Sequence, residues 1–240
     1  ELKLFDKSEK DYDFIIKSSK KNSNIYYEAI YNKSQLLLLN GSFKTGFKLY
    51  ESRFNLNEYY STKILNTEKK IISLNSLHNK TVLVIGEQGI GDNIQFSRYL
   101  KLLKAKCLKI IFCVDKKMKV FFEKLKIADT ICTSDDKIGY YDFNVHLMSL
   151  PHLFNTDHLN VPEINFNIHP DNLKLKLWQD IIKPYQKFFK IGINTTSNKN
   201  IPGRDIPLNY FKNLSKFNKL KLFNLQKNFD NDLLNKEFDI

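Results

Sequence analysis

The apolar and polar positions of this chain follow two different patterns. Residues 26–39 place apolar side chains at helical spacing. A second helix is predicted after them, because Phe43, Phe47 and Tyr50 recur at i, i+4 and i+7. From residue 81 onward, short β-branched runs alternate with helical patterns, which is typical of a parallel α/β sheet with right-handed crossovers. We therefore predict an α/β protein with a helical N-terminal segment.

The α/β region is predicted in more detail from the same pattern. Four strands are expected, at residues 81–85, 108–114, 129–133 and 143–147, with helices near residues 93–104 and 116–126. A long helix near residues 171–187 carries Trp178, which we expect to anchor packing. A strand at 188–194, a helix led by Pro207 and a strand at 219–225 then begin a second domain. Such a domain usually needs more than ~100 residues, so we expect this one to be incomplete.

These segments divide the chain into four parts. Residues 1–56 form helices, 57–80 a polar connector, 81–187 the first Rossmann-like domain and 188–240 part of a second one. The N-terminal helix pair, joined by Gly-Ser-Phe, resembles a tetratricopeptide repeat, and residues 12–16 precede its second helix by the ~34-residue period of that repeat. This resemblance implies a surface for a protein partner, although the aromatic stripe of the helices is interpreted as core.

A glycine-rich turn directly after the first strand is the main candidate for chemistry. It contains Gly86, Gly89 and Gly91, three of the chain's eight glycines, and Asp92 follows it. Such use of glycine indicates either a positive φ or close approach of another group to the backbone. Open α/β sheets bind ligands at the carboxyl ends of their strands, so this turn is placed where a ligand is expected.

The spacing of these glycines excludes two common nucleotide sites. It is not the G-x-G-x-x-G of dinucleotide-binding folds, and no Lys-Ser/Thr follows as in a P-loop. Asp92 has two interpretations that the residues alone leave open, with the first slightly favoured. It caps a helix N-terminus, or it accepts a proton from a substrate hydroxyl as a general base.

Four segments together resemble a known family. GEQGIGDNIQFSRYL at 86–100 resembles the signature of bacterial proteins in which tetratricopeptide repeats precede a glycosyltransferase family 9 domain, which is similar to ADP-heptose:lipopolysaccharide heptosyltransferases. GSFKTGFKLYESRF at 41–54, MSLPHLF at 148–154, and IGINTTSNKN with GRDIPLNYFKNL within 191–214 fit the same family in the expected order. The resemblance implies a GT-B architecture, in which one Rossmann-like domain binds the acceptor and the other a nucleotide-diphosphate sugar.

The resemblance also implies roles for the residues of the turn. Asp92 occupies the position of the family's general base, which deprotonates an acceptor hydroxyl for a single, inverting displacement. Gly89 and Gly91 would let the acceptor approach the backbone. Glu87 and Gln88 would orient the acceptor or, equally well, stabilise the turn.

On the donor side, Thr195, Thr196 and Arg204 fall where the family binds the diphosphate. Hydroxyls and a cation suit phosphate oxygens, although strand-end hydroxyls are the simpler interpretation of the two threonines. NTTSNKN departs from the family pattern, so the donor sugar, ADP-linked or other, stays open. The five histidines show no ligand spacing, and we expect a metal-free mechanism without a cofactor other than the nucleotide-sugar co-substrate.

Composition narrows the partners further. The net charge is +12, but lysine is spread along the chain and no RNA-recognition or zinc-finger spacing is present, so no nucleic-acid partner is expected. No apolar run approaches the ~20 residues of a membrane span, and three cysteines without ligand spacing indicate reduced thiols. We expect a cytoplasmic protein with at most peripheral contact at the inner face of the membrane. Because the chain begins at Glu1 rather than Met, it is also expected to lack its natural start.

Arginine is rare in this chain, and the positions of the few arginines are informative. Only three of the 38 basic residues are arginines, and all three lie inside the family-like segments. Arg presents a planar fork of donors that Lys cannot replace. We expect structural roles for Arg53 and Arg98 and a ligand role for Arg204.

The sequence therefore predicts an inverting glycosyltransferase that moves a sugar from a nucleotide-diphosphate sugar to a glycan or glycolipid acceptor of the lipopolysaccharide or cell-surface polysaccharide type. We expect these 240 residues to be inactive alone, because they lack the family's segment for the nucleotide base. The alternative is a non-catalytic scaffold, in which repeat helices recruit a partner to a degenerate transferase domain. Protein O-glycosylation enzymes also join such repeats to a GT-B fold, but the EQGIGD motif points elsewhere.

Overall fold

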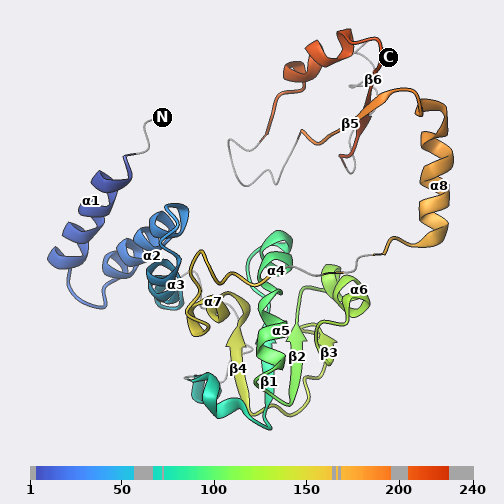
Figure 1. Ribbon diagram of the computed structural model, residues 1–240. Helices are drawn as coiled ribbons and strands as arrows, with labels where there is room; N and C mark the ends of the chain where they lie inside the picture. The colour runs from blue at the N-terminus through green and yellow to red at the C-terminus, as the bar shows by residue number, and fades with distance from the viewer. Residues whose placement is uncertain are drawn as a thin grey trace. The chain divides into compact units, whose positions relative to one another are not determined.

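The computed structural model describes residues 4–56, 67–71, 73–163, 166, 169–195 and 205–226. The chain forms two compact units, Glu1–Ile168 and His169–Ile240 (Figure 1). Each unit is described by itself. The sequence placed the helix near 171–187 in the first α/β domain, whereas by contacts this helix belongs to the second unit.

Three helices open the first unit: α1 (Phe5–Ser18), α2 (Asn24–Leu39) and α3 (Phe43–Tyr50), followed by a 3-10 helix at Glu51–Asn55. The helix pair predicted from residue 26 is confirmed. Helix α2 starts where the Ser23 side chain accepts a hydrogen bond from the backbone N–H of Tyr26. On α3, a Cβ on Gly46 would lie 2.8 Å from Leu38, so the absence of a side chain lets α3 pack closely on α2.

The first unit continues with a four-stranded parallel sheet. Its strands are β1 (Thr81–Ile85), β2 (Lys109–Cys113), β3 (Thr130–Cys132) and β4 (Phe143–His146), in the order β3-β2-β1-β4. The helices are α4 (Ile90–Phe96), α5 (Tyr99–Lys104), α6 (Lys116–Leu125) and α7 (Leu150–Leu153). All four predicted strands are confirmed to within a residue at each end. The single helix predicted at 93–104 is wrong in two respects, because it begins at residue 90 and is interrupted by Ser97 and Arg98.

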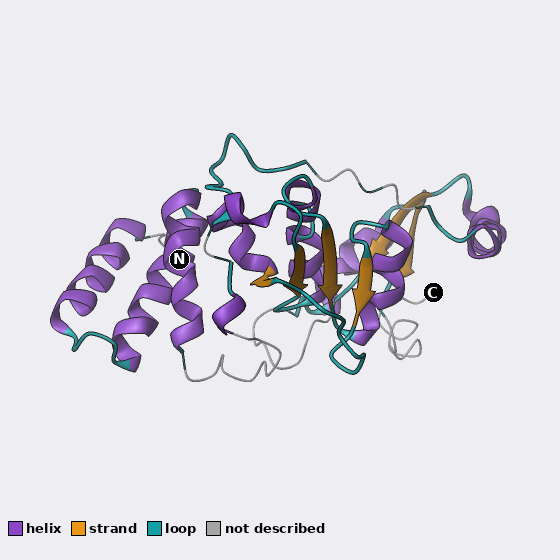
Figure 2. Cartoon of the chain, turned by 90° about the horizontal axis from the view of Figure 1, so that it is seen from below, coloured by secondary structure: helices purple, strands orange, loops and turns teal. Residues whose placement is uncertain are grey.

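Both faces of the central strand β1 are buried, as is usual for parallel sheets, and its sequence is accordingly a continuous apolar run. Val82 and Val84 face the larger core, which Leu100, Phe112 and Phe122 help to fill. On the opposite face, Leu83 and Ile85 of β1 belong to a smaller apolar cluster. Figures 1 and 2 place the N-terminal helices on the β4 side of the sheet, where α3 contacts α7.

The second unit contains α8 (Asn172–Ile182), 3-10 helices at Lys183–Tyr185 and Leu208–Lys216, and the parallel strands β5 (Phe189–Ile193) and β6 (Leu220–Asn224). The helix predicted at 171–187 thus ends earlier. The prediction of Trp178 as a packing anchor is wrong for the described residues, because its side chain is 57% exposed and no residue of α8 is buried.

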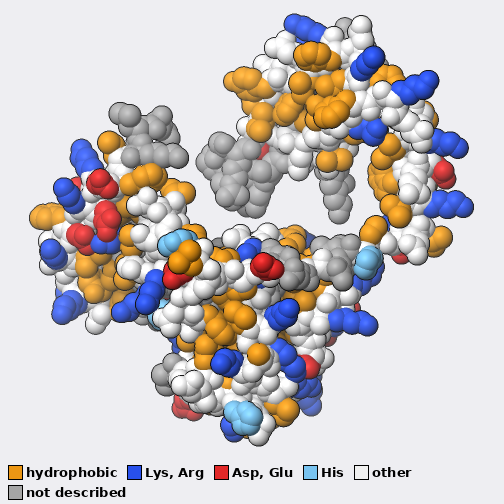
Figure 3. All heavy atoms as spheres, viewed as in Figure 1, with side chains coloured by type: hydrophobic (Ala, Val, Ile, Leu, Met, Phe, Trp, Pro, Cys, Tyr) orange, Lys and Arg blue, Asp and Glu red, His pale blue; other side chains and the backbone are white. Residues whose placement is uncertain are grey.

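The distribution of basic side chains and the length of the apolar helices concern two kinds of partner, nucleic acid and the membrane. On the face shown in Figure 3, Lys and Arg side chains are scattered over the molecule and do not gather into one patch. Within the described parts of the chain, no helix combines the length and the apolar character that crossing a bilayer requires.

Candidate functional site

The order of the strands locates the candidate site. The chain runs from β1 to β2 and β3 on one side and then returns to place β4 on the other side of β1. Ligands of open α/β sheets bind outside the carboxyl ends of the strands at such a reversal. β1 ends at Ile85 and β4 ends at His146, so the segments 86–92 and 147–149 border the candidate site.

An arginine from the N-terminal helices joins these two segments. Arg53 is fully buried, and its Nε and Nη2 donate to the two carboxylate oxygens of Glu87 at 3.1 and 2.8 Å. Nη2 also donates to the hydroxyl of Ser149 at 2.9 Å, and Nη1 donates to the carbonyl of Tyr50 and the carboxylate of Glu51. Forked pairs of this kind are the strong charge-assisted hydrogen bonds. Arg53 therefore has the structural role expected for it and links the N-terminal helices to the segments that follow β1 and β4.

Glu87 is held from a second direction, because the backbone N–H of Met148 donates to its carboxylate at 2.9 Å. Burial is the largest single influence and by itself would lower the pKa of Arg53, but the charges and hydrogen bonds of Glu87 and Glu51 together outweigh it and raise that pKa, so the pair stays charged. The Glu87 side chain is 4% exposed. Of the two roles left open for Glu87, this geometry favours stabilisation of the turn over orientation of an acceptor.

The turn itself is fixed by close backbone contacts. Gly86 donates its N–H to the carbonyl of Cys113 at 2.8 Å, and a Cβ on Gly86 would collide with the side-chain oxygen of Asn93. Asn93 donates its amide to the carbonyls of Glu87 and Gly89 at 2.9 and 2.8 Å. The close approach predicted for the glycines is thus confirmed at Gly86, where it comes from the protein itself.

The other glycines differ from this expectation. The positive φ in the turn belongs to Gln88, at 63°, while the φ of Gly89 is −84°. Gly91 does not have a positive φ, and a Cβ placed on it would have no heavy atom of a neighbouring group within 4 Å, so its surroundings are open space. The exposed part of the turn is accordingly its outer side, at residues 88–91, where Ile90 is 54% exposed.

Asp92 lies in the first turn of α4. Because the helix begins at Ile90 with Gly89 as its N-cap, Asp92 is the third helical residue and not the cap residue that the sequence suggested. Its Oδ2 accepts a hydrogen bond from the N–H of Gly89 at 3.0 Å, while Oδ1 has no hydrogen-bond partner among the described residues. The side chain is partly exposed. One oxygen is thus available to a ligand while the other stabilises the helix start.

A buried histidine lies behind the ion pair. Both ring nitrogens of His146 lack a hydrogen-bond partner among the described residues, and its Nδ1 is 3.6 Å from Glu87. The ring centroid is 4.7 Å from that of Phe54. Burial lowers the pKa of His146 to about 4 against the attraction of Glu87, so the imidazole is neutral at neutral pH.

Three of the segments that carry the family resemblance therefore meet at one edge of the sheet. They are residues 41–54, 86–100 and 148–154. The residues that bring them together, Arg53 and Ser149, were not among the predicted site residues. The scarcity of arginine in a lysine-rich chain was the signal for Arg53. Nothing in the sequence identified its partner, because a pair 34 residues apart has no local pattern.

Of the predicted donor-side residues, the structure describes Thr195. It follows β5 as predicted, its side chain is buried, and its carbonyl accepts the N–H of Ile206 at 2.9 Å. Thr196 and Arg204 lie outside the described residues. Across the described ranges, no group of three or more His, Cys, Asp or Glu residues is arranged to hold a metal ion.

The fold defines the class of the protein only coarsely. It is a mixed α/β protein whose four-stranded parallel sheet is flanked by helices, which is compatible with a Rossmann-like fold. Comparisons with models of protein families, with characterised proteins and with solved structures find no match for this chain.

Loss of Arg53 should destabilise the first unit strongly. Arg53→Ala leaves the Glu87 carboxylate buried without its cation, a change that costs about 3–5 kcal/mol of unfolding free energy. Urea denaturation followed by circular dichroism measures this loss. Arg98→Ala is the matched control, because Arg98 is half-buried and donates to backbone carbonyls; it should cost less than about 1 kcal/mol. Equal losses in the two variants would contradict the role given to Arg53.

Two glycine substitutions in the turn should have different effects. Gly86→Ala forces a methyl group against Asn93 and should cost about 1–3 kcal/mol, as overpacking does. Gly91→Ala meets no atom within 4 Å and should be neutral or should stabilise α4 by up to ~1 kcal/mol, because alanine favours helix. Thermal denaturation of both variants tests the difference. A loss of stability in Gly91→Ala would contradict the open space around Gly91.

Stability should decrease in mildly acidic solution because of His146. Its pKa is about 4 in the folded chain and 6.5 when exposed, so between these values the unfolded chain binds the extra proton. Unfolding free energy should therefore fall by up to roughly 3 kcal/mol as the pH is lowered from 6.5 to 4. Urea denaturation between pH 4.5 and about 7.5 measures the slope, and most of it should be absent in His146→Gln. An unchanged slope in that variant would assign the effect to other groups.

Proposed function

We propose that this chain belongs to an inverting glycosyltransferase, in which the first unit binds the acceptor and Asp92 is the general base. The observation that carries the proposal is the position of Asp92. It lies at the carboxyl edge of the sheet beside the strand-order reversal, with Oδ1 free of partners among the described residues and the open backbone of Gly91 next to it. The family resemblance of residues 86–100 supports the same role.

The reaction follows from these groups. The Asp92 carboxylate accepts the proton of an acceptor hydroxyl, and the oxygen forms a bond to the anomeric carbon of the donor sugar. The bond between that carbon and the diphosphate breaks, and the nucleoside diphosphate leaves with the bonding electrons. A single displacement of this kind inverts the anomeric configuration. No covalent link between sugar and protein forms.

The remaining residues of the turn serve to hold this geometry. The N–H of Gly89 fixes one Asp92 oxygen, Asn93 fixes the backbone on both sides of Gln88, and Glu87 is fixed by Arg53. A general base held in place in this way needs little reorganisation when a substrate binds. Gln88 and Gly89 would contact the acceptor, a glycan or glycolipid of the cell-surface polysaccharide type.

The donor part of the proposal rests on the resemblance. Thr195 at the end of β5, with Thr196 and Arg204, would bind the diphosphate of a nucleotide sugar, ADP-linked or other. The proposal includes a cytoplasmic location, with at most peripheral contact at the inner face of the membrane. It also allows a protein partner on the N-terminal tetratricopeptide-like helices.

One observation favours the alternative of a non-catalytic scaffold. The hydrogen bond from the Gly89 N–H is enough to explain an aspartate at position 92, because a carboxylate in the first turn stabilises a helix without any ligand. In that case the helices α1–α3 would recruit a partner and the sheet would only support them.

Asp92→Asn separates the two functions. The amide oxygen of Asn can still accept the Gly89 N–H, so the melting temperature should change little, but the proton acceptor is lost. Release of nucleoside diphosphate from ADP-, GDP- and UDP-sugars should fall by about 10²–10⁴-fold in the protein expressed from its complete reading frame. Asp115→Asn is the matched control, because Asp115 caps α6 after the neighbouring strand β2. If both variants release nucleotide at the wild-type rate, Asp92 is a structural cap and the transferase proposal fails.

A further inference from the structure

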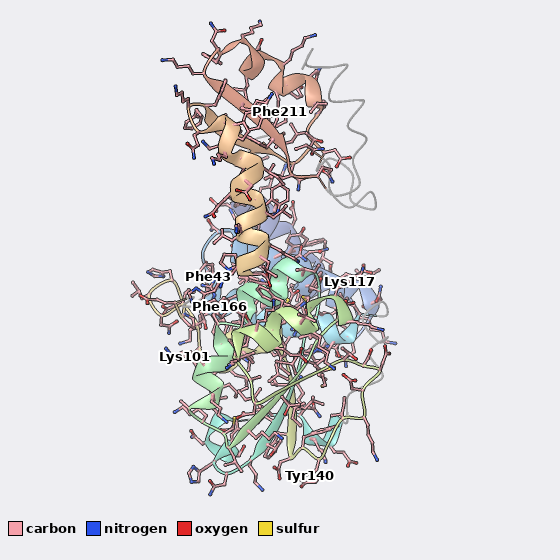
Figure 4. All side chains as sticks on the ribbon, turned by 90° about the vertical axis from the view of Figure 1, so that its right-hand side faces the viewer. Phe43, Lys101, Lys117, Tyr140, Phe166 and Phe211 are labelled. Carbon is pink, nitrogen blue, oxygen red and sulfur yellow. The ribbon has the colours of Figure 1, made fainter. Side chains whose placement is uncertain are left out.

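A pocket of about 260 Å³ lies within the first unit, between the N-terminal helices and the α/β part. Its wall is largely apolar, and its aromatic part comes from Phe43, Phe47, Phe96 and Tyr99. The Phe47 and Phe96 rings meet edge to face at 6.0 Å, and the Phe96 and Tyr99 rings stack at 6.4 Å. Phe43 is labelled in Figure 4. Apolar surface in such a concave, preformed site favours an apolar ligand.

One cation belongs to the wall of this pocket. Arg98 donates from Nε to the carbonyl of Gln95 at 2.7 Å and from Nη1 to the carbonyl of Pro162 at 3.2 Å. These acceptors are neutral, and the ion pairs found among the described residues do not include Arg98. Its positive charge is therefore not balanced within that part of the chain, and Nη2 remains available to an anion.

The nearby polar groups do not compete for that charge. The Thr156 hydroxyl in the wall accepts the hydroxyl hydrogen of Tyr99 at 3.0 Å. Asp157, next to Thr156 in the sequence, is not part of the wall, and its carboxylate accepts the N–H of Leu159 at 2.8 Å. An anionic head beside Arg98 would thus meet a cation and neutral groups.

We propose that this pocket binds a medium-chain alkyl carboxylate, with the hydrocarbon chain among the aromatic rings and the carboxylate on Arg98. A dry cavity of about 150 Å³ accepts benzene, so 260 Å³ suits a chain of roughly eight to ten carbon atoms. A carboxylate accepts hydrogen bonds from a guanidinium in matching geometry. The site does not depend on the transferase activity and is formed by residues that the activity does not use.

Isothermal titration calorimetry of the whole chain with a series of alkyl carboxylates tests this site. Binding should strengthen about fourfold for each added methylene group and level off near decanoate, when the pocket is full. Decyltrimethylammonium, which has the same chain and the opposite charge, should bind at least ~10-fold more weakly because it meets Arg98. Arg98→Gln should remove this preference for the anion.

Two tryptophan variants locate the binding. Val161 lies at the pocket and is 38% exposed, so Val161→Trp should fill it and weaken decanoate binding at least ~10-fold. Val120→Trp, on the exposed side of α6, is the matched control and should bind as the wild type does. Equal affinities in the two variants, equal binding of cation and anion, or affinity that keeps rising beyond twelve or so carbons would each overturn the proposal. Such results would assign binding to other apolar surface, such as that of α8.

Discussion

The buried pair of Arg53 and Glu87 is the interaction on which the arrangement of the first unit depends. A charge in the protein interior is tolerated only with a partner and further hydrogen bonds, and this pair has both. Its partners come from α3, from the turn after β1 and from the segment after β4. The N-terminal helices are therefore not a separate module beside the sheet, because one of their side chains completes the strand ends where open α/β sheets bind ligands.

This constraint also determines which surface a ligand can reach. Arg53 and the neutral His146 occupy the inner side of the strand-order reversal, and both are buried. What remains accessible is the outer side of the turn, from Gln88 to Asp92. The interior contacts hold the backbone there in one conformation without any ligand, and a preorganised backbone is what a binding or catalytic turn needs. The same contacts would be just as useful to a scaffold, so rigidity alone does not decide between the two functions.

The fold of the first unit could be predicted from the sequence because its signals are local. A β-branched run, a glycine turn and a helical stripe specify β1, its turn and α4–α5 within a few residues. The break at Ser97–Arg98 and the start of α4 at residue 90 were missed, since helix ends depend on hydrogen bonds that no propensity encodes. The Arg53–Glu87 pair was missed for a different reason: its members are distant in sequence, and only the packed structure brings them together.

Asp92 shows most clearly why sequence and fold stop short of a function. A carboxylate three residues after a glycine N-cap satisfies a backbone N–H and complements the helix dipole, and the same position at the carboxyl edge of a parallel sheet suits a general base. Both roles suit an acidic residue here, so its presence cannot distinguish them. They differ in the second oxygen: a cap needs one acceptor, whereas a base needs one acceptor and one oxygen open to a substrate. The structure leaves Oδ1 without a partner among the described residues, next to a glycine with open space around it, and this asymmetry favours the catalytic interpretation.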